Sequence, residues 1–198
     1  IRDRSPSRGL GDVYKRQEVG SAYGMTKLGA EKLHPIVARG ILIDLAAVLG
    51  DMEAGQAATM EDVRAALKKQ GMEDFEFAEG DGIFFRYGWE RNWEDPKAFN
   101  VGCPGVDLSV ARWVAEEVKA GVTGGDTWPG TDPVPYPGEE ACGFCIHTYL
   151  QTRHGIVNHE NLALKQLADA GVYVFAYIFN PAPIVGATGS IGSPVAIR

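Results

Sequence analysis

Histidine and glutamate residues with the spacing of a metal site gather in the last third of the chain. His147, His154 and His159 fall within thirteen residues, and Glu160 directly follows the last of them. Imidazole and carboxylate groups are common protein ligands for zinc and manganese, and imidazole also titrates near neutral pH. The cluster therefore predicts metal binding or acid–base chemistry.

The same residues also fit a purely structural interpretation. His154 stands beside Gly155, where a helix is expected to end, and a positive charge there suits the helix dipole. If His147 lies on that helix and Glu160 follows the turn at Gly155, their side chains can meet. Two ligands are still too few for a catalytic zinc ion, which generally needs three protein ligands and an open position.

A CxxC pair, Cys142 and Cys145, is a second candidate for chemistry. In thioredoxin-like proteins this motif follows a strand and opens a helix, and the helix N-terminus activates the first thiol. Here a loop rich in proline and glycine precedes it. Two incidental cysteines at a helix start are the favoured interpretation, and a thiol oxidoreductase is the alternative.

The composition indicates an acidic globular protein. The chain has 198 residues, 45% of them hydrophobic, with a formal charge of −7 and a pI of about 5.1. This balance argues against nucleic acid or an anionic membrane as a partner. A small-molecule substrate is the partner that we expect. No apolar run approaches the ~20 residues of a transmembrane helix. Three cysteines form no disulfide framework, so a reducing cytoplasm is predicted.

Residues 1–17 differ in character from the rest of the sequence. They carry five basic residues against two acidic ones and show no apolar periodicity. The string resembles the translation of a sequencing adapter at the end of a bacterial metagenomic assembly. We therefore expect it to be non-native and leave it out of the fold.

Alternating apolar runs and turn residues predict a mixed α/β chain. Runs rich in β-branched and aromatic residues predict strands at 36–45, 82–87, 172–179 and 194–197. Apolar stripes at helical spacing predict helices from the cap Thr59 to Gly71, from the cap Ser109 to Gly121, and over 144–152. Residues 123–138 are predicted to form a loop.

Three further residues are candidates for a pocket wall. Trp89, with Trp93 and nearby arginines, could form an aromatic and cationic surface, although the edge of a core is the more usual place for such residues. Asp126 and Trp128 lie in one turn, which is either part of a site or a loop anchor.

Taken in order, several segments resemble the cyclase family of metal-dependent hydrolases, which includes bacterial kynurenine formamidases, isatin hydrolases and proposed polyketide cyclases. The matching stretches are 24–50 (GMTKLGAEKLHPIVARGILIDLAAVLG), 80–89 (GDGIFFRYGW), 105–113, 125–128 (GDTW), 147–162 and 181–197 (PAPIVGATGSIGSPVAI). The resemblance covers essentially everything after residue 20, and the order and spacing of the segments make it specific.

The resemblance implies an α/β fold of the swivelling β/β/α type, with mixed sheets and a few flanking helices. It also implies an arylformamidase-like hydrolase, of the kind used in tryptophan catabolism, that cleaves a C–N amide or lactam bond with water activated by zinc or manganese. His147 and Glu160 match the histidine and glutamate that the C-terminal half of the family gives to the metal site. His154 and His159 match no ligand position. A homodimer or larger homo-oligomer is implied as well.

The remaining ligands of the family lie in an HxGTHxDxxxH-like motif that this chain lacks, since no histidine precedes His34. We therefore expect residues 18–198 to be the C-terminal portion of one hydrolase domain, incomplete at its N-terminus and inactive alone. The catalytic groups are unknown and expected in the missing motif. Tyr87 replaces the threonine expected in the family. A degenerate, non-catalytic binding member of the same fold is the alternative.

Overall fold

The computed structural model describes residues 20–21, 24–25, 29–138 and 143–198. The chain divides into two compact units, of which the first comprises Ile1–Val37 with Ile178–Val195 and the second Ala38–Tyr177 with Ala196–Arg198. The adapter-like segment 1–17 lies outside the described residues. The predicted site residues all belong to the second unit.

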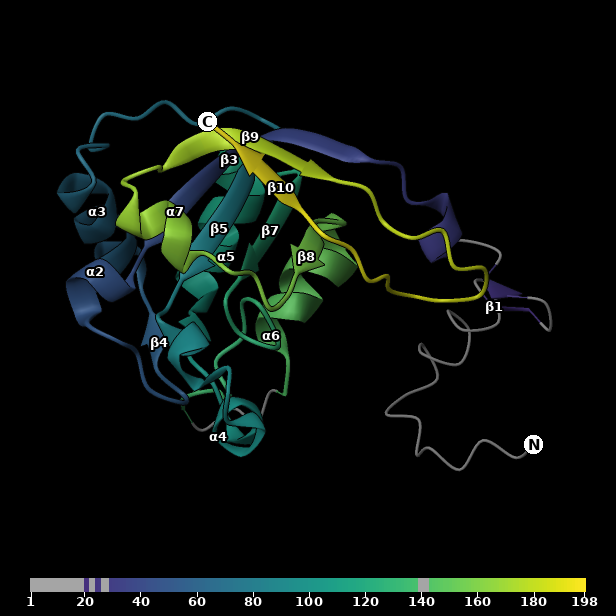
Figure 1. Cartoon of the computed structure of the whole chain (residues 1–198), viewed down its shortest axis with the longest axis horizontal. Helices are drawn as coiled ribbons and strands as arrows, with labels where there is room; N and C mark the ends of the chain where they lie inside the picture. Colours follow the sequence, from purple (N-terminus) through teal and green to yellow (C-terminus); the bar gives the residue numbers. More distant parts are fainter. Residues whose placement is uncertain (1–19, 22–23, 26–28, 139–142) are drawn as a thin grey trace. The chain divides into compact units, whose positions relative to one another are not determined.

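A six-stranded sheet forms the framework, with the order β10-β9-β3-β5-β7-β8 (Figure 1). Its strands are β3 (Ile36–Asp44), β5 (Gly82–Arg86), β7 (Val122–Gly125), β8 (Val157–His159), β9 (Val174–Phe179) and β10 (Val195–Ile197). The neighbours β3 and β5, β5 and β7, and β7 and β8 run parallel. Short pairs add β1 (Gly20–Ser21) to β2 (Gly24–Met25) and β4 (Ala57–Ala58) to β6 (Gly105–Val106).

Short helices connect these strands. They are the 3₁₀ turns η1 (Ala30–Lys32) and η2 (Trp89–Asn92), the π-helical turns η3 (Trp113–Val118) and η4 (Thr148–Arg153), and the α-helices α2 (Ala46–Leu49), α3 (Met60–Lys69), α4 (Pro96–Val101), α5 (Leu108–Arg112), α6 (Cys145–His147) and α7 (Lys165–Asp169). In the part of the chain that is described, no helix is long and apolar enough to cross a membrane.

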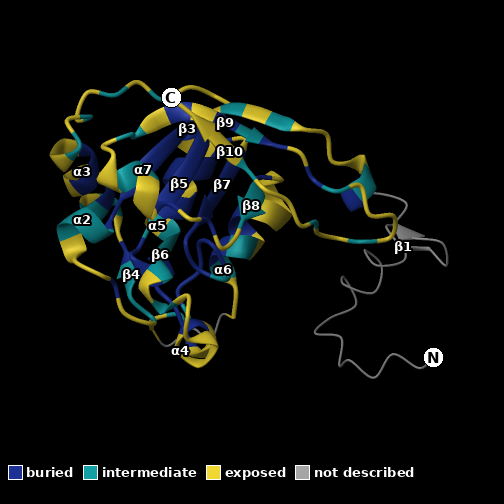
Figure 2. Ribbon diagram, in the orientation of Figure 1, coloured by how far each residue is buried: buried dark blue, intermediate teal, exposed yellow. Residues whose placement is uncertain are grey.

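The central strands supply the core because both of their faces are covered. Ile41, Ile43, Ile83 and Phe85 are fully buried in one cluster with apolar residues of α3, α5 and α6. Figure 2 shows β5 and β7 mostly buried, whereas β10 is exposed. Strands buried on both faces are typical of parallel sheets and appear in sequence as continuous apolar runs. The strands predicted at 36–45, 82–87, 172–179 and 194–197 are confirmed.

The first unit is built from the segments that flank β3 and β9. The backbone N–H of Ala30 donates to the Ala187 carbonyl at 2.8 Å. Phe179 lies so close to Gly192 that a Cβ atom there would be 2.2 Å from its ring. The hydrogen bond joins residues 29–37 to residues 178–195, and the contact of Phe179 with Gly192 lies within the latter segment.

The helix predicted after Thr59 is confirmed as α3. Thr59 and Asp62 form a capping box, in which each side chain accepts a hydrogen bond from the other residue's backbone N–H. Val63, Ala66 and Leu67 make its buried stripe.

The predicted cap of the next helix was wrong by two residues. Asp107, not Ser109, is the N-cap of α5, and its carboxylate accepts from the Val110 backbone N–H at 3.1 Å. Ser109 instead donates its hydroxyl to Asp107 at 2.5 Å. An ionised carboxylate is the stronger acceptor at a helix N-terminus, which explains the preference.

The loop predicted at 123–138 was also partly wrong, because its first residues belong to β7, which pairs between β5 and β8. Gly124 and Gly125 indicated a turn, since glycine is usually unfavourable in strands. Here neighbouring backbone requires them. A Cβ atom on Gly124 would lie 2.1 Å from the His159 carbonyl oxygen, and one on Gly125 would lie 2.3 Å from that of Gly130.

The helical segment predicted at 144–152 is confirmed as α6 continued by η4. His154 forms its C-cap, and Gly155 follows with φ of 70°. The short strand β8 comes next and was not predicted. Glu160 directly follows this strand, so the position of β8 in the sheet determines the position of Glu160.

Candidate functional site

Charged and polar side chains gather where the parallel strands end. Asp44 ends β3 and Arg86 ends β5, whereas Asp126 follows β7 and Glu160 follows β8. Because parallel strands end at the same edge of a sheet, these residues are brought to one edge from distant parts of the sequence. The carboxyl edge of a parallel sheet is the usual place for ligand binding.

His147 and Glu160 are brought together at this edge. His147 is the last residue of α6, and the turn at Gly155 leads through β8 to Glu160. The Nε2 atom of His147 lies 3.4 Å from Oε1 of Glu160. The imidazole is mostly buried, whereas the Glu160 side chain is 45% exposed. The proximity expected from the sequence is therefore present.

Asp132 also contacts His147, and sequence reasoning missed it. Its carboxylate is fully buried and accepts hydrogen bonds from the backbone N–H groups of Ile146 and His147 at 2.8 and 2.9 Å. The same carboxylate is hydrogen-bonded to Nδ1 of the His147 ring. Asp132 lies 15 residues from His147 in a segment predicted as loop, so no local pattern links the two.

Asn158 on β8 completes the surroundings of the imidazole. Its Nδ2 donates to the Pro129 carbonyl at 3.0 Å and lies 3.1 Å from Nε2 of His147. The imidazole ring also makes a T-shaped contact with the Phe144 ring, with ring centroids 5.5 Å apart. The imidazole is thus held from three segments of the chain.

The electrostatics of the site favour a charged imidazole while no metal is bound. Burial lowers the pKa of His147, but hydrogen bonds with Asp132 and Glu160 outweigh it and raise that pKa to about 9. A metal ion at Nε2 would replace the proton there, so metal binding would release a proton.

The other two histidines of the cluster lie apart from this pair. His159 points to another partner, with its Nδ1 2.5 Å from the hydroxyl of Tyr177 on β9, and burial lowers its pKa. His154 caps η4 and packs against the Tyr149 ring. Within the described ranges, no three histidine, cysteine or acidic side chains are grouped so that they could hold a metal ion. Cys142 of the CxxC pair lies outside those ranges.

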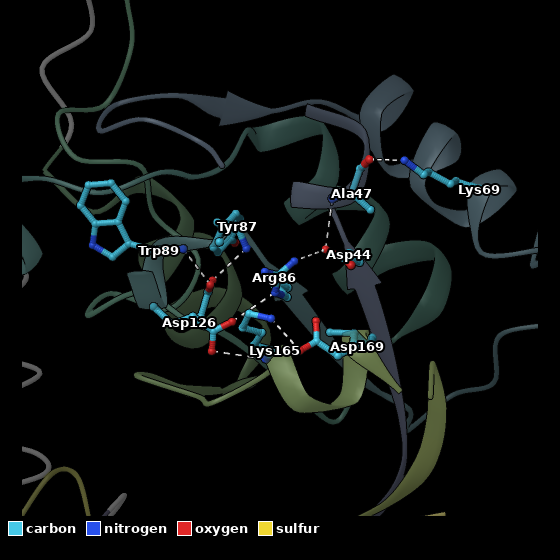
Figure 3. Close-up of polar contacts among 12 residues, drawn as sticks. Asp44, Ala47, Lys69, Arg86, Tyr87, Trp89, Asp126, Lys165 and Asp169 are labelled. Atoms are coloured by element: carbon cyan, nitrogen blue, oxygen red, sulfur yellow. Dashed lines mark hydrogen bonds and ion pairs between the residues drawn. The ribbon is translucent and has the colours of Figure 1, made fainter. Parts of the chain in front are cut away.

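Asp126 anchors a turn rather than facing a neighbouring cation (Figure 3). Its carboxylate is buried and accepts from the backbone N–H groups of Tyr87 and Trp89 at 2.8 and 2.9 Å. Burial raises the pKa of Asp126 to about 6, although these two hydrogen bonds lower it. Tyr87 itself is a core residue with no exposed surface.

Beside Asp126, a chain of ion pairs crosses the same edge of the sheet. The Arg86 guanidinium donates to the Asp44 carboxylate at 2.9 Å (Figure 3) and to the Glu90 carboxylate at 3.1 Å. The Lys165 backbone N–H donates to the same Glu90 carboxylate at 3.3 Å. A pocket of about 370 Å³ lies here, and its lining includes Glu90, Trp93, Asp126, Asn161, Leu162 and Lys165. The lining residues Asn161 and Leu162 directly follow Glu160.

The two predicted tryptophans have different surroundings. Trp89 is a core residue, whose indole N–H donates to the Phe99 carbonyl at 3.1 Å and whose ring lies under Arg91. Trp128 is half-buried and packs edge-to-face on Phe144, the residue that also contacts His147. Its buried indole N–H has no hydrogen-bond partner in the described part of the chain. Phe144 thus links Trp128 to the histidine, and Trp128 also packs against the small core cluster that contains Trp89.

Three comparisons place this geometry among known proteins. A solved structure described as a novel cyclase is 25% identical to this chain in sequence and matches its fold with a TM-score of 0.72. The match covers 92% of this chain and 62% of the novel cyclase. Isatin hydrolase A from Ralstonia solanacearum has 20% identity and a TM-score of 0.68, covering 86% and 64%. A potential metal-dependent hydrolase with cyclase activity has 22% identity and a TM-score of 0.53, covering 81% and 65%. No curated protein matches the sequence.

These likenesses confirm the predicted α/β fold, and the chain spans about 62% of the length of the novel cyclase. The sequence profile of the cyclase family matches residues 18–133, a range that includes Trp89, Asp126, Trp128 and Asp132 but ends before His147. The match covers more than half of the sequence. The chain belongs to the cyclase family.

Proposed function

We propose that this chain is part of a metal-dependent hydrolase that cleaves a C–N amide or lactam bond by means of metal-activated water. The observation that carries the proposal is the pairing of His147 with Glu160. Two ligand atoms about 2.1 Å from a tetrahedral zinc ion lie roughly 3.4 Å from each other. Nε2 of His147 and Oε1 of Glu160 are 3.4 Å apart, so this donor pair fits a zinc or manganese ion.

The comparisons support the reaction type at a coarser level. The chain's family and its structural neighbours indicate a hydrolase or cyclase, and one neighbour is an isatin hydrolase bound to the product analogue thioisatinate. Isatin is a lactam, and its hydrolysis breaks a C–N bond. At 19% identity that neighbour shows the fold alone, so the same bond is our proposal for this chain.

Each residue of the site has a role in this proposal. His147 would ligate through Nε2 while Asp132 holds its other nitrogen, and Glu160 would supply a negatively charged oxygen. A bound divalent metal lowers the pKa of water and polarises a carbonyl oxygen. The Trp128 indole N–H would donate to the substrate or to a water, and the pocket lined by Asp126 and Asn161 would hold the rest of a small molecule.

Two ligands do not complete such a site, because a catalytic zinc ion generally takes three protein ligands. We propose that the remaining ligands come from outside the described residues. By family resemblance we further propose a homo-oligomeric, cytoplasmic enzyme.

The test uses the product of the whole gene, whatever sequence flanks these residues. Isatin ring opening and arylamine release from an arylformamide are followed after EDTA treatment and after Zn²⁺ or Mn²⁺ is added back. We expect metal-restored turnover that falls at least about 100-fold in His147→Gln and Glu160→Gln. A matched control, Glu73→Gln, changes an exposed carboxylate that pairs with Lys68 and should retain full turnover. Turnover that survives EDTA, or both site substitutions, would contradict the proposal.

A further inference from the structure

The loop that carries Asp132 is hydrogen-bonded to the segment around Cys103 and Val106, which holds Asp132 next to His147. The backbones of Cys103 and Val134 exchange two hydrogen bonds, of 2.9 and 2.8 Å, and the Val106 N–H donates to the Thr131 carbonyl at 2.9 Å. Gly105 lies directly against this loop, where a Cβ atom would be 2.3 Å from the carbonyl carbon of Asp132. The carboxylate is therefore held by rigid backbone on both sides.

The contacts of Asp132 determine whether the His147 nitrogen that faces it, Nδ1, carries a proton. An ionised carboxylate has only acceptor sites, and two backbone N–H groups already donate to this one. Its third contact is with Nδ1 of His147, so Nδ1 must be the donor. This holds whether the imidazole is neutral or positively charged, because both forms can carry a proton on Nδ1.

We propose that Asp132 is a positioning residue that keeps the His147 ring in one orientation with its proton on Nδ1, which leaves Nε2 directed at Glu160. The inference rests on the proposed function for its purpose, but its geometry is independent of any metal. A residue that only capped α6 would need the two backbone contacts and not the contact with the ring. The contact of Asp132 with the His147 ring therefore distinguishes a positioning residue from a residue that only caps the helix.

The first test is nuclear magnetic resonance of the ¹⁵N-histidine-labelled protein without metal. We expect a slowly exchanging Nδ1–H proton on His147 that shows one-bond coupling at every pH where the protein is folded. This signal should persist in Glu160→Gln and disappear or lose its exchange protection in Asp132→Asn. Because the wild-type spectrum is informative alone, an Nδ1 without a proton would overturn the proposal even if the variant fails to fold.

Asp126→Asn is the matched control. Asp126 is also a buried carboxylate that accepts two backbone N–H bonds, but it has no contact with His147 among its hydrogen bonds. The control should keep the Nδ1–H signal despite a similar loss of backbone hydrogen bonding. Loss of the signal in both variants, or in neither, would overturn the specific role of Asp132.

A second readout separates this inference from the proposed function. Titration with Zn²⁺ alone should show an affinity that is about 10- to 100-fold weaker in Asp132→Asn than in the wild type. If the Nδ1–H signal follows Asp132 but the wild type binds no Zn²⁺, positioning stands and the metal site fails. Equal Zn²⁺ affinity in wild type and variant would overturn positioning.

Discussion

At the scale of single residues, the site depends on carboxylates with different tasks. Asp132 contacts Nδ1 of the His147 imidazole, Glu160 lies beside Nε2, and Asp126 holds the turn after β5. His147 and Glu160 could be found from the sequence because family resemblance and spacing both indicated them. Asp132 could not, because its partners are brought to it only when the loop after β7 folds back over α6.

The pKa of Asp126 leads to a prediction about stability. Burial raises this pKa to about 6, above its ordinary value of 3.8. Between pH 3.8 and about 6 the Asp126 carboxyl is therefore protonated in the folded state and ionised in the unfolded state. As pH rises through this range, the contribution of Asp126 lowers the free energy of unfolding. The stability contributed by the neutral carboxyl is complete below that window and lost above it.

Denaturant unfolding of wild type and Asp126→Asn at several pH values tests this. The difference in free energy of unfolding, wild type minus variant, should decrease by at most about 3 kcal/mol between pH 4 and 7. A difference that is constant or increases with pH would show that Asp126 is not buried as described.

At the scale of elements, the sheet carries the site because its parallel strands end together. β3, β5 and the helix α3 were predictable, since continuous apolar runs and a capping box are local signals. β7 was not recognised because its glycines, which neighbouring backbone requires, indicate a loop when the sequence is read alone. β8 was missed because three residues give too little pattern to distinguish a strand from a turn.

Gly124 offers a test of this packing. In Gly124→Ala the added Cβ would lie 2.1 Å from the carbonyl oxygen of His159, and backbone on both strands would have to move. We expect a loss of about 2–3 kcal/mol in the free energy of unfolding, because overpacking of a rigid interior costs about that much. The measurement is thermal and denaturant unfolding of the purified variant.

Gly143→Ala is the control, because a Cβ atom there would meet nothing within 4 Å and its φ is not in the left-handed region. It should unfold within about 0.5 kcal/mol of the wild type, as surface substitutions usually do. Equal stability of the two variants would mean that β7 and β8 do not pair as described.

At the scale of the whole molecule, the family was identified from the order of short segments rather than from composition. An acidic charge and an ordinary apolar content excluded partners but indicated no reaction. Four of the six matching segments contain the end of β3, β5, β7 or β8 at the carboxyl edge of the sheet, where the candidate site residues lie. The fold likeness to the novel cyclase extends over 92% of the chain, beyond the residues 18–133 that the family profile matches.

The most direct test of the central claim is binding of Mn²⁺, which broadens resonances close to it even when binding is weak. Substoichiometric Mn²⁺ is added to ¹⁵N-labelled protein, and amide line widths are compared with those of His147→Gln, Glu160→Gln and the control Glu73→Gln. We expect broadening that is centred on the amides around His147 and Glu160. Either site substitution should abolish this broadening, and the control should keep it. Broadening that is centred elsewhere, or is unchanged in both site variants, would contradict a metal site formed by these two residues.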